Sequence, residues 1–387
     1  MGMNLKSLIF KMSGKNIFAK RIIYKYRISQ KWPNRIKEKD IEVWEKNDAL
    51  KRKYLHELLK KQKDDYLLQE CRKEILKFPI CKELKDKKAL FFFISDMIFC
   101  YRAYGVTPNE YLLFEYWKKK PDERKAFITD LNRYEYYYWM NDPYIEKILF
   151  DKYKTWEKYK KYMGRDMLKV TKNSEEKDIT EFISKHLKFV MKPLDLSRGE
   201  GVQAYQFDGT NMRNLLETIR NVKQCILEEI IVQTMEMKAL HPESVNTVRC
   251  PTVYTQNGGV IFHPVLRMGR GGSFVDNAAA GGIIANIDAE TGIVISDGVD
   301  ENGNHYEIHP DTKVKIKGFQ IPKWNELIQF ANDISSVMPE VRYVGWDMAL
   351  TDNGWVMIEG NCHGQFLCEY VDQVGRKAEM DELQKRI

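Results

Sequence analysis

The chain has 387 residues, of which 43% are hydrophobic and 30% are charged, and it carries a formal net charge of +7. This length exceeds one typical domain, so two or three sub-domains are expected. No apolar run approaches the roughly 20 residues that a membrane-spanning helix needs. The seven cysteines are irregularly spaced, which is typical of reduced intracellular thiols and not of a disulfide framework. These features predict a cytoplasmic protein.

The positive charge is concentrated near the N-terminus. Residues 1–88 contain 25 Lys and Arg against 12 Asp and Glu, and the rest of the chain is net acidic. Within residues 1–30, apolar residues recur at helical spacing among lysines and arginines. This segment is either a basic helix lying on an anionic membrane surface, peripheral at its inner face, or an ordinary helix packed on the domain behind it. The second interpretation is favoured. Because acids are interspersed with the lysines, no nucleic-acid partner is expected.

The sequence predicts three segments along the chain. Residues 1–88 alternate Lys and Glu around leucines, which predicts a basic helical arm. Residues 89–165 are rich in Tyr and Trp at helical spacing, which is typical of core and inter-helix packing. Residues 166–375 change to short apolar strands separated by glycines and turns, with a helix expected over 323–337.

A lysine and a glycine-containing loop follow one of these strands. The predicted strand over 187–193 ends at Lys192, and Ser197, Gly199 and Gly201 lie in the loop after it. Glycine allows close approach of the backbone, so such a loop can offer N–H groups to phosphate oxygens. A flexible hairpin tip has the same composition, so the loop alone does not identify a phosphate site.

The next strands carry acids and arginines. An apolar strand over 225–231 ends in Glu228 and Glu229, where backbone groups could meet a base edge and a carboxylate could meet ribose, although a solvated strand end is the commoner explanation. Arg249 and Arg267, on the two following strands, could clamp phosphate or carboxylate bidentately. Either arginine alone would more often lie on the surface. The glycine-rich segment 269–282 is either a loop that closes over substrate or a floppy connection.

Residues 343–365 are predicted to form a hairpin that turns at Asp352-Asn353-Gly354. A three-residue loop, with Gly354 in the left-handed position, would pair Asp347 with Glu359 and Met348 with Ile358. Since side chains alternate along a strand, the face toward the core would then carry Met348, Leu350, Val356 and Ile358. The other face would carry Asp347, Glu359 and Asn361.

Two carboxylates and an amide on one strand face suit a hard cation such as Mg²⁺. The competing interpretation is an edge hairpin whose polar face is only solvated. Cys362 and His363 directly follow Asn361, and His263 precedes Arg267 by four residues. They are expected to pack around the site and not to react.

In order along the chain, these segments resemble the ATP-grasp superfamily, and specifically its branch related to α-L-glutamate ligases, the sugar-transfer-associated ATP-grasp family. The resemblance covers about residues 90–370. It is carried by Met191-Lys192-Pro193 with Ser197-Arg-Gly-Glu-Gly201, Ile226-Leu-Glu-Glu-Ile230, Asn246-Thr-Val-Arg249, Phe319-Gln-Ile-Pro322, and Tyr343-Val-Gly-Trp-Asp347 through Glu359-Gly-Asn361. It implies an α+β fold, the ATP-grasp fold, in which two α+β lobes hold a nucleotide between them.

The resemblance also implies ATP and Mg²⁺ as cofactors and gives roles to residues of this chain. Lys192 would contact the α- and β-phosphates, and Lys152 would be the earlier lysine of the superfamily, with Lys154 and Lys158 as its competitors. The loop with Ser197, Gly199 and Gly201 would cover the triphosphate. Glu228 and the backbone of Ile230 would meet adenine. The remaining roles are ribose binding by Glu236, with Glu229 as its competitor; Mg²⁺ binding by Asp347, Glu359 and Asn361; and phosphoryl-group stabilisation by Arg267, with Arg249 as the weaker candidate.

The activity implied by this family is an ATP-dependent ligation of a carboxylate to an amine through an acyl-phosphate, in cell-surface polysaccharide assembly. The partners would be small-molecule or glycan-linked carboxylates and amines. Two alternatives stay open at this point. One is a kinase on the same scaffold that phosphorylates a hydroxyl acceptor, and the other is a non-catalytic adaptor that docks through its basic arm.

Overall fold

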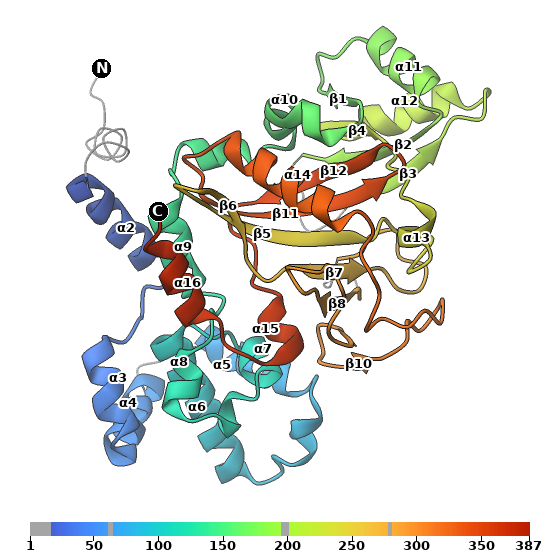
Figure 1. Ribbon diagram of the computed structural model, residues 1–387. Helices are drawn as coiled ribbons and strands as arrows, with labels where there is room; N and C mark the ends of the chain where they lie inside the picture. The colour runs from blue at the N-terminus through green and yellow to red at the C-terminus, as the bar shows by residue number, and fades with distance from the viewer. Residues whose placement is uncertain (1–16, 61–64, 195–200, 278–280) are drawn as a thin grey trace. The chain divides into compact units, whose positions relative to one another are not determined.

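The computed structural model describes residues 17–60, 65–194, 201–277 and 281–387 (Figure 1). The chain forms two compact units. The helical unit comprises Met1–Pro143, Asn302–Asn304 and His363–Ile387, and the sheet unit comprises Tyr144–Glu301 and His305–Cys362. The three predicted segments 1–88, 89–165 and 166–375 divide the chain at other positions and stay predictions.

The helical unit is built from short α and 3-10 helices. Its helices are α2 (Ile17–Lys31), α3 (Glu38–Glu45), α4 (Asp48–Lys60), α5 (Asp65–Ile75), η1 (Pro79–Lys82), α6 (Lys87–Tyr104), α7 (Pro108–Leu113), η2 (Tyr116–Lys118), α8 (Pro121–Lys125), α9 (Arg133–Met140), α15 (Cys368–Asp372) and α16 (Lys377–Gln384). The sequence sets the ends of the long helix α6. Asp86 accepts a hydrogen bond from the Ala89 N–H at its start, and Gly105 ends it with a left-handed φ of 73°.

Aromatic side chains form the core of the helical unit, as their helical spacing predicts. Phe99, Tyr111, Phe114 and Tyr116 have no exposed surface, and the Phe114 ring lies 4.7 Å from that of Phe127. The C-terminal segment folds back onto this core. The buried Glu369 carboxylate accepts the N–H groups of Ile128, at 2.9 Å, and of Arg376, at 2.6 Å.

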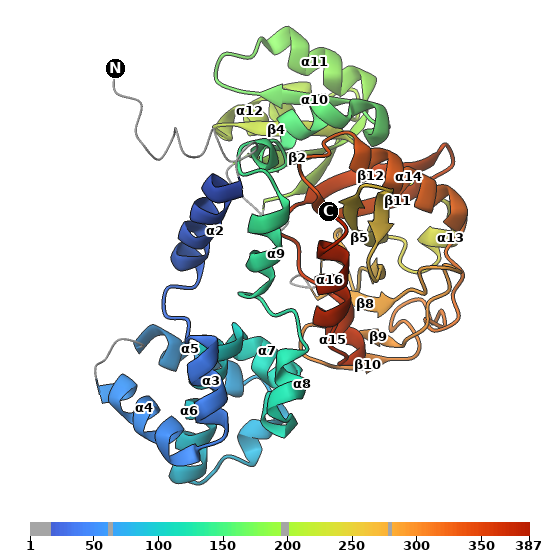
Figure 2. The ribbon, with the colours of Figure 1, turned by 60° about the vertical axis from the view of Figure 1, so that its left-hand side comes forward.

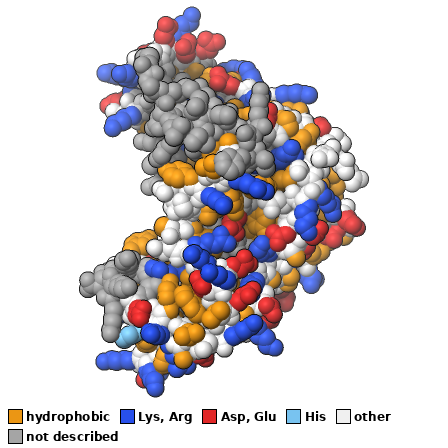
Figure 3. All heavy atoms as spheres, turned by 90° about the vertical axis from the view of Figure 1, so that its left-hand side faces the viewer, with side chains coloured by type: hydrophobic (Ala, Val, Ile, Leu, Met, Phe, Trp, Pro, Cys, Tyr) orange, Lys and Arg blue, Asp and Glu red, His pale blue; other side chains and the backbone are white. Residues whose placement is uncertain are grey.

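Helix α2 packs on α9 (Figure 2). Cations of α2 lie over aromatic rings of α9. Lys20 lies 4.9 Å from the centroid of Trp139, and Arg27 lies 3.7 Å from that of Tyr138. Each cation gains from the negative face of the ring below it. For residues 17–31 this confirms the favoured interpretation of a helix packed on its own unit; residues 1–16 lie outside the described part of the chain. Basic and acidic side chains intermingle on the face drawn in Figure 3.

Among the described residues, no helix combines the length and apolar character needed to cross a membrane. The described cysteine side chains, at positions 71, 100, 225, 250, 362 and 368, are buried thiols.

The sheet unit begins with α10 (Lys152–Met163) and contains a small antiparallel sheet in the order β1-β4-β2-β3. Its strands are β1 (Met167–Val170), β2 (Lys188–Pro193), β3 (Gln203–Gln206) and β4 (Cys225–Glu229). Two amphipathic helices, α11 (Glu176–Lys185) and α12 (Met212–Asn221), bury Ile183 and Ile219 against this sheet. The prediction of strands that lead to Lys192 and Glu228 is confirmed.

A second, larger antiparallel sheet follows, in the order β10-β9-β8-β7-β5-β11-β12, with β6 paired to β5. Its strands are β5 (Thr247–Thr255), β6 (Gly258–Ile261), β7 (Val265–Met268), β8 (Ile283–Asn286), β9 (Gly298–Val299), β10 (His305–Tyr306), β11 (Tyr343–Thr351) and β12 (Gly354–Asn361). The chain between β6 and β7, over residues 262–264, leaves the sheet, because Pro264 has no N–H to donate and His263 adopts a left-handed φ of 44°.

Helix α14 (Trp324–Ser336) covers one face of the larger sheet (Figure 1). Its residues Leu327 and Ile334 share a buried cluster with Trp346, Met348 and Met357 of the hairpin β11–β12. Because neighbouring side chains of a strand point to opposite faces, Asp347 must lie on the face turned away from α14. The short helix α13 (Met235–Lys238) precedes this sheet in the chain.

The hairpin differs in register from the prediction. Asp347 pairs with Glu359 as predicted, but Met348 pairs with Met357 and not with Ile358. Thr351 pairs with Gly354, so the loop has two residues, and the extra residue becomes a bulge where the register shifts between Asp347 and Met348. The hairpin residues in the main core are Val344, Trp346, Met348, Leu350, Trp355 and Met357.

The predicted placement of Val356 and Ile358 on the core face is therefore wrong. Val356 faces the other way and approaches Gly164 so closely that a Cβ added there would lie 2.7 Å from its Cγ1. The bulge explains how Asp347 and Glu359 still meet: it adds one residue to β12 and so restores their pairing after a tighter turn.

Candidate active site

Four charged side chains gather on the larger sheet, on the face opposite α14. They come from neighbouring strands, because β7, β5, β11 and β12 are adjacent in the sheet. Arg249 of β5 pairs directly with Asp347 of β11, which pairs with Glu359 of β12. Arg267 of β7 lies opposite Thr247, two residues from Arg249 and so on the same face. The antiparallel register alone therefore brings these residues together.

Asp347 is the centre of this group. Its carboxylate accepts hydrogen bonds from Nε of Arg249, from Nη2 of Arg249 at 2.8 Å and from Nη1 of Arg267 at 2.8 Å. All three residues are buried. Burial by itself would raise the pKa of Asp347, but the two guanidinium groups outweigh it and hold that pKa well below its ordinary value. Asp347 is therefore an anion in the folded protein.

Glu359 and Asn361 complete the group. The Asn361 amide donates to Oδ2 of Asp347 at 3.3 Å and to Oε1 of Glu359 at 3.0 Å, so the three predicted metal ligands lie within hydrogen-bonding distance. Glu359 is exposed to solvent, unlike Asp347. Partial desolvation by the surrounding protein and repulsion from the Asp347 carboxylate raise its pKa above the ordinary value. Closely spaced carboxylates that repel each other are the arrangement a divalent cation relieves.

Asp276 belongs to the same network, and it was not among the site residues predicted from the sequence. Its carboxylate accepts from Nη2 of Arg267 at 2.7 Å, from the Thr247 N–H at 3.2 Å and from the Thr247 hydroxyl. Asp276 therefore fixes one side of the Arg267 guanidinium while Asp347 fixes the other. One feature of the sequence could have identified Asp276: it is an acid within the glycine-rich segment that follows the strand of Arg267.

The smaller sheet contributes a second charged group. Lys192 of β2 places its Nζ 2.5 Å from Oε2 of Glu228 on the adjacent strand β4. Although burial alone would raise the pKa of Glu228, Arg165 and Lys192 lower it to about 2. The Lys152 ammonium donates to the Pro193 carbonyl at 3.2 Å, beside Lys192 in the chain.

Arg165 links the two groups, and no pattern in the sequence pointed to it. It lies between α10 and β1, and its guanidinium donates to Glu228, to the Met357 carbonyl at 2.6 Å and to the Ile358 carbonyl at 3.0 Å. Ile358 immediately precedes Glu359. A single buried side chain therefore connects the partner of Lys192 with the strand that carries Glu359.

The other predicted nucleotide-binding residues occupy less distinctive positions. Glu229 accepts the Asp166 N–H at 3.0 Å, Ile230 directly follows β4, and Glu236 is exposed in the first turn of α13. Gly201 has a left-handed φ of 71°. Ser197 and Gly199 lie outside the described residues. The roles predicted for these residues stay predictions.

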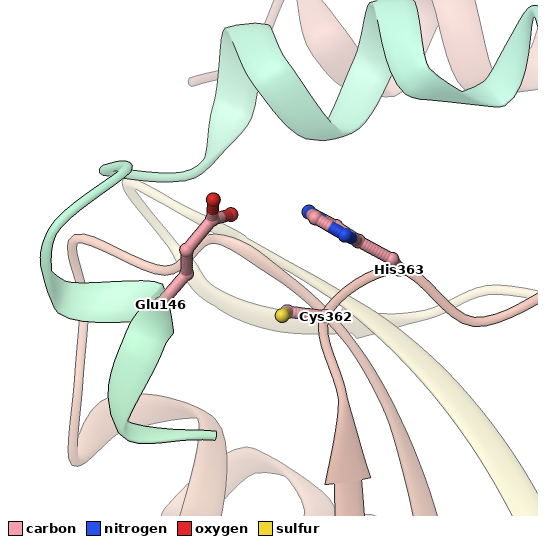
Figure 4. A group of neighbouring side chains, drawn as sticks. All are labelled: Glu146, Cys362 and His363. Carbon is pink, nitrogen blue, oxygen red and sulfur yellow. The ribbon is translucent and has the colours of Figure 1, made fainter. Parts of the chain in front are cut away.

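Cys362 ends the hairpin and packs as expected. It is 1% exposed and belongs to the main core of the sheet unit. Glu146, from the short helix η3 (Ile145–Ile148), is also buried; Figure 4 shows that these two side chains come from η3 and from the end of β12. His363 is the first residue of the C-terminal part of the helical unit.

A family comparison agrees with this fold. The model of the sugar-transfer-associated ATP-grasp family matches residues 131–384. This match covers more than half of the chain, so the protein belongs to that family. The resemblance and the ATP-grasp fold expected from the sequence are both confirmed.

Solved structures with a similar fold are distant. They include the ATP-grasp ligase PsnB complexed with minimal precursor, Mg and ADP, with 11% identity, 68% of each chain covered and a TM-score of 0.39. The D-alanyl-alanine synthetase A of Vibrio cholerae O1 biovar eltor str. N16961 has 12% identity, a TM-score of 0.37 and coverage of 62% of this chain and 61% of its own. The D-alanine–D-alanine ligase of Bacillus anthracis has 12% identity, a TM-score of 0.37 and coverage of 64% and 69%. No curated protein matches the sequence.

Proposed function

We propose that this protein is an ATP- and Mg²⁺-dependent ligase that joins a carboxylate to an amine through an acyl-phosphate. Family membership supports the use of ATP. The observation that carries the proposal is the cluster of Arg249, Arg267, Asp347, Glu359 and Asn361 on one strand face. Such a face supplies oxygen ligands for a cation and two guanidinium groups for phosphate oxygens.

The charges of this cluster favour joint binding of Mg²⁺ and nucleotide. The network holds three carboxylates, those of Asp276, Asp347 and Glu359, against two guanidinium groups, so its net charge is −1 and its attraction for a free cation is weak. A polyphosphate would add several negative charges, and the cluster with Lys192 could then hold both polyphosphate and Mg²⁺. Asp347, Glu359 and Asn361 would hold the ion, which neutralises charge on the phosphates when bound.

In the proposed reaction, a carboxylate oxygen of the first substrate attacks the γ-phosphorus of ATP, and ADP leaves. The amine nitrogen of the second substrate then attacks the acyl carbon and loses a proton, and inorganic phosphate leaves. Phosphoryl transfer needs orientation and positive charge more than a protein nucleophile. Arg267 would steady the transferring group, because Asp276 and Asp347 hold its guanidinium from two sides.

The substrates would be an amino acid or a similar amine and a small-molecule or glycan-linked carboxylate, used in cell-surface polysaccharide synthesis. The description of the family, which associates it with sugar transfer, supports a substrate linked to a sugar. Lys192 would bind the phosphates, with Lys152 behind it. The Glu228 carboxylate is already paired with Lys192 and Arg165. The backbone of Ile230 is therefore the better candidate for binding adenine.

Substrate-dependent ADP release tests the proposal. The wild type is screened with amino acids and uronic acids in the presence of Mg-ATP, and the acceptor is analysed after reaction. A ligase yields a condensed product and free phosphate, whereas a kinase leaves phosphate on the acceptor. Lys192→Met should lose nucleotide binding, while Lys188→Met, an exposed lysine on the same strand, should not. If Mg-ATP neither binds nor raises the melting temperature, the proposal is wrong.

A further inference from the structure

Arg165 is the described residue that connects the phosphate side of the proposed site to its metal side. We propose that Arg165 is a positioning residue with two linked tasks: it holds the bulge that directs Glu359, and it remains the partner of Glu228 when Lys192 turns to a phosphate. This inference rests on the proposed function, because it assumes that Lys192 and Glu359 serve Mg-ATP.

The first task follows from the bulge in β12. A bulge interrupts the ladder and leaves backbone groups unpaired there. Arg165 supplies donors at this position, with Nη1 2.6 Å from the Met357 carbonyl and Nη2 3.0 Å from the Ile358 carbonyl. Because Ile358 is bonded to Glu359, fixing its carbonyl fixes the direction in which the Glu359 side chain leaves the strand.

The second task follows from the burial of the three charges around Glu228. The side chains of Arg165 and Glu228 are 2% and 4% exposed, whereas that of Lys192 is 22% exposed. Lys192 is therefore the member of the trio with room to turn toward a ligand. If it leaves, Glu228 still has the Arg165 guanidinium and does not become an unpaired buried anion, which would be costly.

Only an arginine can perform both tasks from this position. Its planar fork uses Nε for Glu228, Nη1 for the carbonyls of Met163, at 2.9 Å, and Met357, and Nη2 for Ile358. Lysine has the same charge but a single nitrogen, so it would keep the partner of Glu228 and lose the fork across the bulge. Methionine would lose both.

The experiment measures affinity for Mg-ADP by calorimetry in the full-length wild type, in Arg165→Met, and in the double variant Arg165→Met with Glu228→Gln. We expect Arg165→Met to bind about 10- to 100-fold more weakly, because Glu228 would then hold Lys192 as its sole cation. The double variant should recover most of this loss, since the carboxylate that retains Lys192 is gone. A residue that only supported the fold would not be rescued by removal of its own partner.

Arg165→Lys separates the two tasks and also serves if Arg165→Met does not fold. It should retain Mg-ADP affinity within about threefold, yet need about tenfold more Mg²⁺ for half-maximal ADP release, because the bulge carbonyls lose their donors. The matched control is Arg342→Lys, an arginine that donates to a backbone carbonyl, that of Tyr254, at 3.1 Å within the larger sheet. The control should behave like the wild type in both measurements.

The outcomes separate this inference from the proposed function. Absence of Mg-ADP binding by the wild type overturns the proposed function, and the turning of Lys192 with it. Normal binding by the wild type together with unchanged binding by Arg165→Met overturns only the role of Arg165. A double variant no better than Arg165→Met, or an Arg165→Lys variant with unchanged Mg²⁺ dependence, removes the corresponding task.

Discussion

Each unit contains a cluster of charged side chains, and the two clusters differ in what their acids contact. In the helical unit, the Asp96 carboxylate accepts from Lys51 at 2.7 Å, from the Arg124 Nη2 at 2.8 Å and from the Tyr111 hydroxyl at 2.8 Å. In the sheet unit, Asp347 is paired in the same way with Arg249 and Arg267. Glu359 beside it, however, meets an amide and a like-charged carboxylate.

The pKa values of Asp96 and Glu359 shift in opposite directions because of this difference. Burial would raise the pKa of Asp96, but Arg124 and Lys51 lower it, whereas partial desolvation and Asp347 raise that of Glu359. An acid satisfied by cations of its own protein contributes to stability. An exposed acid that is repelled by its neighbour is more stable with a cation that the fold does not supply. The comparison separates a structural charge cluster from one suited to a ligand.

The largest expected effect concerns Glu359, the exposed acid of the sheet unit. Glu359→Gln keeps the size of the side chain and an oxygen for the Asn361 hydrogen bond, but it removes the charge. We expect substrate-dependent ADP release to fall about 1,000-fold, because a bound metal ion contributes several kcal/mol to phosphoryl transfer. The melting temperature, followed by circular dichroism, should stay close to that of the wild type. An unchanged rate would remove Glu359 from the metal site.

The paired acid of the same cluster should respond in stability as well as in activity. Asp347→Asn leaves Arg249 and Arg267 buried without their anion, so we expect the free energy of unfolding to fall by about 3–5 kcal/mol in urea titrations. Asp352→Asn, on the exposed turn of the same hairpin, is the control. The contrast with Glu359 would be lost if Asp347→Asn were as stable as the control.

The stability of the protein at low pH should show the contribution of Glu228, the second ion-paired carboxylate of the sheet unit. The folded-state pKa of Glu228 is about 2, below the ordinary value of 4.5, so its stabilising contribution is complete above about pH 4.5. That contribution is lost as the pH falls through about 2, and it amounts to about 3 kcal/mol. Urea titrations at several pH values should show a steeper fall for the wild type than for Glu228→Gln. Parallel curves would contradict the ion-paired state of Glu228.

In the helical unit, the corresponding change should affect stability alone. Asp96→Asn weakens charge-assisted hydrogen bonds from Lys51 and Arg124, and we expect a loss of about 2 kcal/mol in the free energy of unfolding. Mg-ADP affinity, measured by calorimetry, should not change. Asp48→Asn removes an acid whose side chain is 80% exposed and should do neither. Weaker Mg-ADP binding in Asp96→Asn would show that the helical cluster is not purely structural.

The smallest effect concerns helix α2. Lys20→Met keeps the aliphatic stem over Trp139 but removes the cation, which we expect to cost about 0.5 kcal/mol. Lys25→Met, at an exposed position of the same helix, is the reference. Thermal unfolding of the two variants at low and high salt would measure the difference. Equal stabilities would mean that the cation–π contacts contribute little.

The sequence by itself determined the features that depend on local pattern. The order of strands and helices and the position of Lys192 near the end of β2 follow from alternation, turn residues and their order along the chain. These are short-range preferences, and they were sufficient to identify the ATP-grasp family. The predicted metal ligands and the two arginines come together because neighbouring antiparallel strands place them on one face.

Only the tertiary structure decided the features that depend on contacts between distant residues. Arg165 is a lone arginine after a helix in the sequence, and its role arises because Glu228 and the carbonyl of Ile358, 63 and 193 residues away, converge on it. Asp276 gains its role in the same way from Arg267 and Thr247. The bulge at the hairpin, too, is set by packing of Trp355 and Met357 into the core, and no pattern within the hairpin alone distinguishes it from an uninterrupted ladder.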